Sequence, residues 1–371
     1  MTKVFTPGDI LASRYKIERY LDAGSMQEVY VARDLAFDRT VVVKVPMNES
    51  ATKRFEASAQ LSAQLNHPNI AKTLDYIPGN DFDVLVEEFV EGPHLRDFLS
   101  QFERVDPQLV GHIFHSLAKG VRTSHTAGIY HRDLKPSNVL TSGEAWPALV
   151  KITDFGVAKR VEDEFDAVAA AQDKVQTLVG SKTLVGAIAY MSPEVVDDPG
   201  DAGPASDVWA LGAVAYELLT GEPPFGSKLA AIQKILNRQP PPAPQVPTGS
   251  VQFKGLVDAL FERILRCLDP DVPSRITADE LVEATAQIAF GSRTRSIGTI
   301  RTYGGGYRPG NWGFISHEGQ DVFFHRDSYY GGTPSEGTKV AFVPVGPRAA
   351  GRAPRAHPVV PLKDNHTLFG T

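Results

Sequence analysis

The spacing of apolar and polar residues changes along the chain and divides it into regions. Residues 15–47 contain three segments rich in strand-forming residues, "YKIERYL", "EVYVARD" and "TVVVKVP", each bounded by Gly, Asp or Pro. Apolar residues then recur near helical spacing in "ATKRFEASAQLSAQL", and Asn-His-Pro at 66–68 ends this pattern. After a further strand pattern, "VLVEEFV", the chain is mainly helical in pattern from Leu95 to about Phe290. The sequence therefore predicts a small β-rich lobe followed by a larger helical lobe.

The pattern changes again after Phe290. "GSRTRS" at 291–296 is a short polar linker, and residues 297–350 are rich in Gly and aromatics, with alternating strand patterns such as "DVFFHRD" and "KVAFVPV". This region is predicted to be a second, all-β domain. Residues 351–371 are rich in Pro, Ala and Arg and show little periodicity, which predicts a flexible tail.

Composition narrows the class of protein. The chain has 371 residues and 42% apolar content, which is enough for a packed core. It has no uninterrupted apolar run of about 18 residues and its first residues lack the layout of a secretion signal, so we expect a soluble cytoplasmic protein without a membrane partner. Cys267 is the only cysteine, which excludes an intramolecular disulfide and a thiolate zinc cluster and favours a buried core position.

Charge is distributed unevenly. From Thr294 to the end there are 9 Lys+Arg against 5 Asp+Glu, whereas residues 1–293 contain 29 against 39. The C-terminal part is therefore the basic one. Such asymmetry favours a nucleic acid or another anionic partner for that part.

Two short stretches carry candidate chemistry. "HRDLKPSN" at 131–138 places an Asp, a Lys and an Asn within six residues, and "DFG" follows at 154–156. Phosphoryl transfer needs a carboxylate at the nucleophile, a cation near the transferred phosphate and oxygen ligands for Mg²⁺. These two stretches supply all three.

Together with the strand that carries Lys44, "SPE" at 192–194, "DVWALG" at 207–212 and "PSRIT" at 273–277, these stretches resemble the eukaryotic-type serine/threonine protein kinase family in order and spacing. The resemblance covers roughly residues 14–285. It implies an α+β bilobal protein-kinase fold over residues 14–290, with a β-rich N-lobe and a helical C-lobe. It also implies ATP-dependent phosphorylation of Ser or Thr on a protein substrate, with ATP and Mg²⁺ or Mn²⁺ as cofactors.

The resemblance assigns roles to individual residues. Asp133 is expected to be the base that orients the substrate hydroxyl, and Lys135 to touch the transferring phosphate. Asn138 and Asp154 are expected to hold the metal, and Lys44 to pair with the α- and β-phosphates. Further nucleotide contacts are expected from Gly24, Val29, Val42 and the backbone of Glu88 and Val90. Glu194 and Arg275 match a structural ion pair of the large lobe.

The glycine-rich loop departs from the family pattern. The family sequence G-x-G-x-x-G-x-V aligns with residues 22–29, where only Gly24 remains. Glycines at such positions let the backbone approach phosphate without an intervening Cβ atom. Asp22 adds negative charge beside an anion. We therefore expect weaker but persistent nucleotide binding.

A second departure concerns the partner of Lys44. The family's helical glutamate falls at Ser58, and the nearest carboxylate, Glu56, is two residues away, about 200° around a helix. We hypothesise that Glu87, at the usually apolar position before the hinge, points into the pocket and pairs with Lys44. The alternative, that Glu87 turns to a different partner, stays open at this point.

A third departure lies in the activation segment, from Asp154 to Glu194. A small hydroxylated residue of the family is replaced by Ala187, which removes a hydrogen bond to the catalytic groups. Candidate phosphorylation sites are Thr177, Ser181 and Thr183. Arg132 could pair with such a phosphate and order the segment.

"GTIRTYGGGYRPGNWGFISHEGQDVFFHRD" at 298–327 resembles the cold-shock domain, a five-stranded OB-type barrel that binds single-stranded nucleic acid. The resemblance covers roughly residues 296–350. Such binding uses aromatic faces for base stacking, with basic residues along the backbone track. The stacking positions fall on Trp312, Phe314, Phe323 and His325, with Tyr303 as a fifth.

This pattern also has departures. Thr302 and Arg326 replace family aromatics, and the loop "GGGYRPGN" is longer than usual. Each lost stacking position weakens binding by about 1–3 kcal/mol, which Arg301, Arg308 and Arg326 could offset through phosphate contacts or stacking. The alternative is a barrel kept as a protein-docking or structural module.

Three functions remain open from the sequence. The first is an active Ser/Thr kinase whose barrel recruits single-stranded RNA or DNA. The second is a nucleotide-binding pseudokinase scaffold with the barrel as a docking module, and the third is a functional barrel regulated by the kinase fold. The first is favoured because Lys44, Asp133, Asn138 and Asp154 are all present, and a chain freed from catalysis has no chemical need for all four. A kinase dimer is a further partner to consider.

Overall fold

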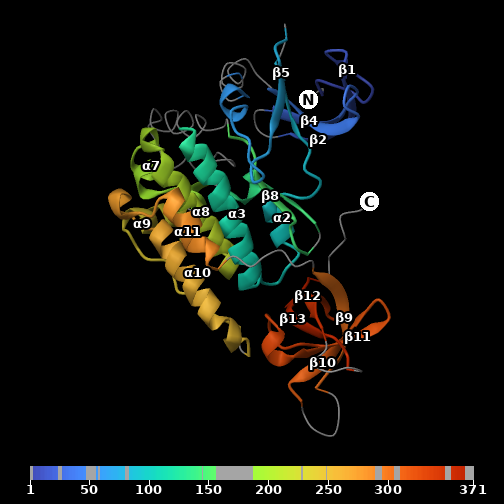
Figure 1. Ribbon diagram of the computed structural model, residues 1–371. Coiled ribbons are helices and arrows are strands. Elements are labelled where there is room, and N and C mark those ends of the chain that lie inside the picture. Colours follow the sequence, from blue (N-terminus) through green and yellow to red (C-terminus); the bar gives the residue numbers. More distant parts are fainter. Residues whose placement is uncertain are drawn as a thin grey trace.

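The computed structural model describes residues 3–23, 27–46, 56, 59–79, 83–143, 145–155, 187–226, 229–247, 249–288, 295–304, 310–346 and 352–363. Figure 1 shows a β-sheet at the top, a group of helices beside and below it, and a small barrel at the bottom. The predicted order of a β-rich lobe, a helical lobe and an all-β domain is thus observed. No helix of the described ranges is long and apolar enough to cross a membrane.

The N-terminal lobe is built on a six-stranded sheet in which every pair of neighbours is antiparallel, in the order β1-β2-β3-β4-β6-β5. The strands are β1 (Ile10–Leu11), β2 (Tyr15–Ala23), β3 (Gln27–Asp34), β4 (Arg39–Pro46), β5 (Thr73–Ile77) and β6 (Val84–Glu88). Alternate residues such as Tyr30, Val41 and Val43 point to one face and form the core of this lobe. The helix expected over 51–65 is seen at Glu56 and residues 59–62.

The second lobe is mainly helical, as the pattern predicts. Its helices are α2 (Leu95–Leu99), α3 (Pro107–Thr126), α7 (Pro193–Asp197), α8 (Pro204–Thr220), α9 (Leu229–Leu236), α10 (Lys254–Cys267) and α11 (Ala278–Ala286). A two-stranded sheet, β7 (Val139–Ser142) and β8 (Leu149–Ile152), lies at its junction with the first lobe. Short 3₁₀ turns are η1 (Pro136–Asn138), η2 (Ile188–Tyr190), η3 (Pro199–Asp201), η4 (Val251–Phe253) and η5 (Val272–Ser274). Cys267 is fully buried in this core, as predicted.

The C-terminal domain is a closed barrel with the strand order β10-β11-β13-β12-β9. Its strands are β9 (Ser296–Tyr303), β10 (Trp312–His317), β11 (Gln320–His325), β12 (Lys339–Val345) and β13 (Arg355–Pro361), and a 3₁₀ turn, η6 (Arg326–Ser328), follows β11. All neighbours are antiparallel except β11 and β13, which run parallel. Ile300, Ile315, Val322 and Phe342 fill the interior.

The prediction of a flexible tail from residue 351 is wrong for Arg355–Pro361. These residues form β13, which pairs with both β11 and β12 and closes the barrel. Ala356 and Val359 are buried because they complete the barrel interior, whereas Val360 is buried on the opposite side of the strand, against the helical lobe. The barrel domain therefore extends beyond the predicted boundary at residue 350.

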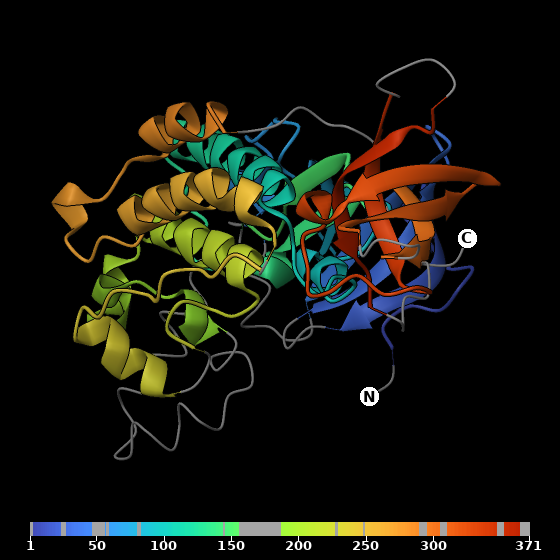
Figure 2. The ribbon, with the colours of Figure 1, turned by 90° about the horizontal axis from the view of Figure 1, so that it is seen from below.

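The barrel packs against the helical lobe, on the side where α2 ends and where α3 and α10 begin (Figure 2). Tyr330, Ala341, Val360 and Leu362 of the barrel belong to the same apolar cluster as the core of the helical lobe. The backbone N–H of Lys363 donates to the carbonyl oxygen of residue 101 at 3.0 Å. The core of the helical lobe thus continues onto the outer side of the barrel, while the barrel interior is a separate cluster.

A buried ion pair also joins the domains. Arg295, at the end of the predicted linker, lies 2.7 Å from Asp106, and neither side chain is exposed. The other oxygen of Asp106 caps α3 by accepting from the backbone N–H groups of Gln108 and Leu109. The Arg295 guanidinium also lies over the Trp146 ring, 5.1 Å from its centroid. The end of the linker is therefore fixed to the start of α3.

Replacing Asp106 by Asn should lower the free energy of unfolding by about 3–5 kcal/mol, because it leaves the Arg295 charge buried without a partner while keeping a capping acceptor. Urea denaturation of the full chain measures this. The matched control is Asp321→Asn, which breaks the exposed Arg301–Asp321 pair and should cost at most about 1 kcal/mol. Equal losses in the two variants would contradict the assigned role of the buried pair.

Candidate functional site

The loop between α3 and β7 holds the predicted catalytic residues close together. The ammonium of Lys135 lies 2.8 Å and 3.0 Å from the two carboxylate oxygens of Asp133. The amide nitrogen of Asn138 donates to the backbone oxygen of Asp133 at 2.8 Å and to its carboxylate at 3.2 Å. Asp133 is 9% exposed, so its carboxylate is oriented by these two neighbours rather than by bulk water.

A buried carboxylate holds this loop from behind. Asp207, on α8, accepts from the backbone N–H groups of His131 at 2.8 Å and Arg132 at 2.6 Å, and from the ring of His125 at 2.9 Å. Arg132 has φ of 61°, a left-handed conformation that a non-glycine residue adopts only when its surroundings hold it there. The motif "DVWALG" thus supplies the anchor of the catalytic loop.

Lys44, on β4, is buried between two carboxylates from different lobes. Its ammonium lies 2.5 Å from Glu87 on β6 and 2.8 Å from Asp154, which follows β8. Burial lowers the pKa of Lys44, but the charges of Asp154 and Glu87 outweigh that effect and raise it overall. Burial likewise opposes ionisation of Asp154, yet Lys44 outweighs it and lowers the pKa of Asp154 to about 2.

The hypothesis that Glu87 pairs with Lys44 is confirmed by this contact. In the register of β4 and β6, Val42 stands opposite Glu87, so Lys44, two residues further along, is a diagonal neighbour on the same face. Burial raises the pKa of the Glu87 carboxyl above its ordinary value. The sheet itself therefore supplies a carboxylate to Lys44.

Asp154 and Asn138 have oxygen atoms left for a cation. Lys44 and Gln27 both bind Oδ1 of Asp154, at 2.8 Å and 3.4 Å, and within the described ranges no contact of its Oδ2 is found. The amide nitrogen of Asn138 donates to Asp133, so the Oδ1 atom of Asn138 remains for a cation. Carboxylate and amide oxygens are the ligands that Mg²⁺ prefers, so this donor set fits the predicted metal.

Two of the residues predicted to contact the nucleotide lie beside Lys44 in the sheet. Val29 stands opposite Lys44 in the sheet, and Val42 is buried on the same strand as Lys44. The backbone N–H of Glu88 donates to the carbonyl oxygen of Lys72 at 2.8 Å, and its carboxylate accepts a hydrogen bond from Lys151 at 3.0 Å. The N–H of Val90 has no acceptor in the part of the chain that the structure describes, which leaves it for a ligand.

The predicted ion pair of the large lobe is confirmed. The guanidinium of Arg275 lies 2.6 Å and 3.0 Å from the two carboxylate oxygens of Glu194, and its side chain is fully buried. It also lies over the Trp209 ring, 5.1 Å from the centroid. Ala187 is buried near the catalytic loop, beside Leu134. Several predicted residues lie outside the described ranges: Gly24, Ser58, Thr177, Ser181, Thr183 and Arg308.

In the barrel, three predicted stacking residues form one outward-facing cluster. Phe314 on β10 stands opposite Phe323 on β11, with ring centroids 5.9 Å apart. Trp312, 38% exposed, lies 5.8 Å from Phe314 and 6.3 Å from Phe323. His325 is the exposed cross-strand partner of Trp312 and lies 3.2 Å from Asp327. We call Trp312, Phe314, Phe323 and His325 the aromatic face.

The prediction that Tyr303 is a fifth stacking residue is wrong. Its ring stacks on Phe324, which is 1% exposed inside the barrel, with centroids 6.0 Å apart. The register of β9 and β10 shifts between Phe314 and Ile315, which places Tyr303 opposite the inward-facing Gly313. Tyr303 therefore packs with the barrel interior.

Two arginines expected to offset lost aromatics have partners within the protein. Arg326 donates to the carbonyl oxygens of Tyr329 at 3.0 Å and Gly332 at 2.9 Å, and Arg301 lies 2.6 Å from Asp321. Other basic residues stand beside the aromatic face, namely Arg352 and Arg355. Both lie in the region predicted to be a tail and are therefore absent from the predicted site, although the basic charge of the C-terminal part points to them.

Comparison with known proteins identifies the family of the first domain. A family model described as the protein kinase domain matches residues 15–285, more than half of the chain. The chain belongs to the protein kinase family. The match ends before β9, so the barrel lies outside it.

Several relatives of this chain are bacterial serine/threonine-protein kinases. The chain is 31% identical over 297 residues to serine/threonine-protein kinase pkn3 of Myxococcus xanthus, covering 78% of this chain and 52% of that protein. It is 33% identical over 283 residues to PknB of Mycobacterium tuberculosis, covering 73% and 42%. It is 30% identical over 291 residues to PrkC of Bacillus subtilis, covering 74% and 42%. The matched region thus spans about half the length of these relatives or less.

A solved structure agrees on the fold of the kinase. The crystal structure of Rad53 residues 1–466 in complex with AMP-PNP is similar, with a TM-score of 0.56 and 24% sequence identity, covering 73% of this chain and 64% of that one. The predicted bilobal kinase fold is confirmed by this similarity and by the family match.

Replacing Glu87 by Gln should weaken the binding of Mg-ATP about tenfold or more, because Lys44 loses a charge-assisted hydrogen bond worth about 1.5–3 kcal/mol. Titration calorimetry with the full chain measures the affinity. Asp83→Asn is the control, since Asp83 binds Tyr76 at 2.6 Å on the same sheet and makes no contact with Lys44. Unchanged affinity in Glu87→Gln would show that Asp154 alone positions Lys44.

Proposed function

We propose that this protein transfers the γ-phosphoryl group of ATP to Ser or Thr residues of a protein substrate. The observation that carries the proposal is the arrangement of Lys44, Asp133, Lys135, Asn138 and Asp154, which are each oriented by specific contacts. The names of the bacterial relatives, serine/threonine-protein kinases, support the same activity.

The chain's own residues account for the chemistry. Asp133 accepts a hydrogen bond from the substrate hydroxyl and takes its proton as that oxygen bonds to the γ-phosphorus. The bond from this phosphorus to the β–γ bridging oxygen breaks at the same time, and ADP leaves. Lys135, 2.8 Å from that carboxylate, is placed to stabilise the negative charge on the transferring group. Lys44 orients the α- and β-phosphates, with Glu87 limiting its movement. Asn138 and Asp154 would hold Mg²⁺, which would supply positive charge to neutralise the phosphates.

Autophosphorylation of the purified full chain tests this activity. With Mg-ATP, the intact mass of the wild type should rise by whole phosphate increments, whereas Asp133→Asn should slow incorporation at least about a hundredfold, because proton transfer by a positioned base contributes about 10²–10⁴-fold. Wild-type chain that binds ATP but gains no phosphate, alone or with a generic basic protein substrate, would favour the nucleotide-binding scaffold instead.

For the barrel we propose an OB-type, cold-shock-like module that binds single-stranded nucleic acid. The strand order, with β11 and β13 parallel and the remaining neighbours antiparallel, supports a five-stranded OB-type barrel. The outward rings of Trp312, Phe314 and Phe323 support base stacking, because a base can lie on any of them without sequence preference. A protein-docking module is the alternative.

Phe323→Ala should weaken binding of fluorescein-labelled dT10 or U10 by about 1–3 kcal/mol, roughly 5–150-fold, because one stacking ring is lost. Fluorescence anisotropy of the full chain at low salt measures this. Phe37→Ala, an exposed aromatic of the N-terminal lobe, is the control and should bind as the wild type does. Absence of oligonucleotide binding by the wild type would leave the docking module as the function of the barrel.

A further inference from the structure

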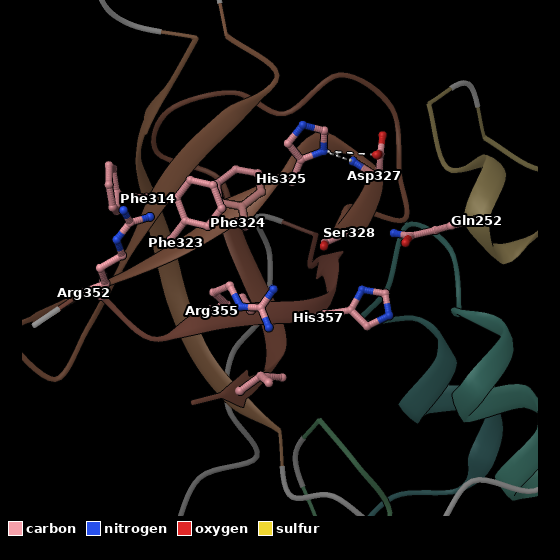
Figure 3. A pocket seen from close by; sticks show the side chains of 13 residues that line it. Gln252, Phe314, Phe323, Phe324, His325, Asp327, Ser328, Arg352, Arg355 and His357 are labelled. Atoms are coloured by element: carbon pink, nitrogen blue, oxygen red, sulfur yellow. Dashed lines mark hydrogen bonds and ion pairs between the residues drawn. The ribbon is translucent and has the colours of Figure 1, made fainter. Parts of the chain in front are cut away.

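A groove of about 740 Å³ opens next to the aromatic face (Figure 3). Phe314 and Phe323 form one of its walls, and Arg352 lies beside their rings. Arg355 projects from β13 into the middle of the groove. At the other end stands Gln252, which comes from η4 of the kinase domain and not from the barrel.

The strand register explains why these side chains line up. Phe314 on β10 is the partner of Phe323 on β11, and Phe323 is the partner of Arg355 on β13. Neighbouring strands are about 4.8 Å apart, so two rings and a guanidinium follow one another in a row across three strands. His325 and His357 each stand two residues further along their strands, in the next row, towards the kinase domain.

The charges in the groove favour an anion. Within the described ranges, no carboxylate is paired with Arg352 or Arg355, and the Nε atom of Arg355 is buried without a hydrogen-bond partner. Among the described residues that line the groove, only Asp327 is acidic, and it already lies 3.2 Å from the His325 ring. A row of rings bordered by unpaired guanidinium groups matches the alternation of bases and phosphates in a single strand.

The kinase end of the groove is firmly attached to the barrel. The ring of Phe253, next to Gln252, stacks on His357 with centroids 5.5 Å apart and contacts Tyr330 edge-on at 5.1 Å. Ser250 donates to the carbonyl oxygen of Tyr329 at 2.6 Å. Gln252 is therefore held at the rim of the groove, and its exposed amide makes no hydrogen bond in the part of the chain that the structure describes.

We propose that a single strand of nucleic acid passes from the aromatic face across Arg352 and Arg355 to Gln252, so that the kinase domain contributes directly to the nucleic-acid site. This inference rests on the proposed function of the barrel and extends it by a basic track, formed by Arg352 and by Arg355 at the start of β13, and by a contact from η4. An acidic peptide would use the arginines but gain nothing from the stacked rings. The rings therefore favour the nucleic acid.

Anisotropy titrations of the full chain with labelled dT10 over a range of salt concentrations test the path. Arg355→Gln and Arg352→Gln should each weaken binding about tenfold and reduce the slope of log K against log salt by about 0.7, the value for one phosphate contact on a single strand. Gln252→Ala should weaken binding about threefold to tenfold without changing that slope, because a neutral hydrogen bond releases no counterion.

Lys254→Ala is the matched control. It lies two residues from Gln252, pairs with Asp258 at 2.6 Å and does not line the groove, so affinity and slope should stay at the wild-type values. A second probe is a decamer of abasic sites, which keeps the phosphates and lacks the bases. We expect it to bind at least tenfold more weakly than dT10.

The outcomes separate this inference from the proposed function. If the wild type binds dT10 and Phe323→Ala weakens it, while the variants at 252, 352 and 355 bind as the wild type does, the strand stays on the aromatic face and the inference is wrong. Equal binding of the abasic decamer would show a surface that recognises only negative charge, as an acidic peptide would present. No binding of dT10 by the wild type would overturn both proposals together.

Discussion

The buried ammonium of Lys44 is the interaction on which the candidate catalytic site depends. An isolated charge in the interior would cost several kcal/mol, and Lys44 is held there because carboxylates from both lobes surround it. Glu87 reaches it from the sheet of the small lobe, and Asp154 from the start of the activation segment in the large one. The same ion pairs therefore position the two lobes and orient the group expected to bind phosphate.

The position of Glu87 also bears on control of the enzyme. A carboxylate on a helix can be withdrawn when the helix moves, whereas Glu87 stands on β6, which is hydrogen-bonded to strands on both sides. Its distance to Lys44 is set by the register of β4 and β6, because both residues belong to neighbouring strands of one sheet. Control by breaking this pair would require rearrangement of the sheet, so regulation is better placed at Asp154 or at the second domain.

The sequence predicted those parts whose pattern is local. The strands of the small lobe are short segments rich in strand-forming residues, and each can be located from its own sequence. The Glu87 hypothesis is confirmed because the pairing of β4 and β6 places Glu87 and Lys44 on the same face of the sheet. The prediction for Tyr303 is wrong because a register shift between β9 and β10 turns its ring inward, and strand pairing is not visible in the spacing of β9 alone. Strand β13 was not predicted because Arg, Pro and Ala dominate its surroundings, while its buried residues complete a barrel whose other strands are distant in sequence. Nor could pattern show that Tyr330 and Leu362 pack against another domain.

One helix connects the domain junction with the catalytic loop. At its first turn α3 is capped by Asp106, which is paired with Arg295, and near its last turn His125 binds Asp207, which holds the backbone of the catalytic loop. With 20 residues the helix is about 30 Å long and behaves as a rigid rod. Movement of the barrel against the helical lobe would have to break the Asp106–Arg295 pair or tilt α3, and tilting α3 would displace Asp207 and the loop that carries Asp133. The described residues thus form one connected path of contacts from the domain boundary, through α3, to the catalytic loop.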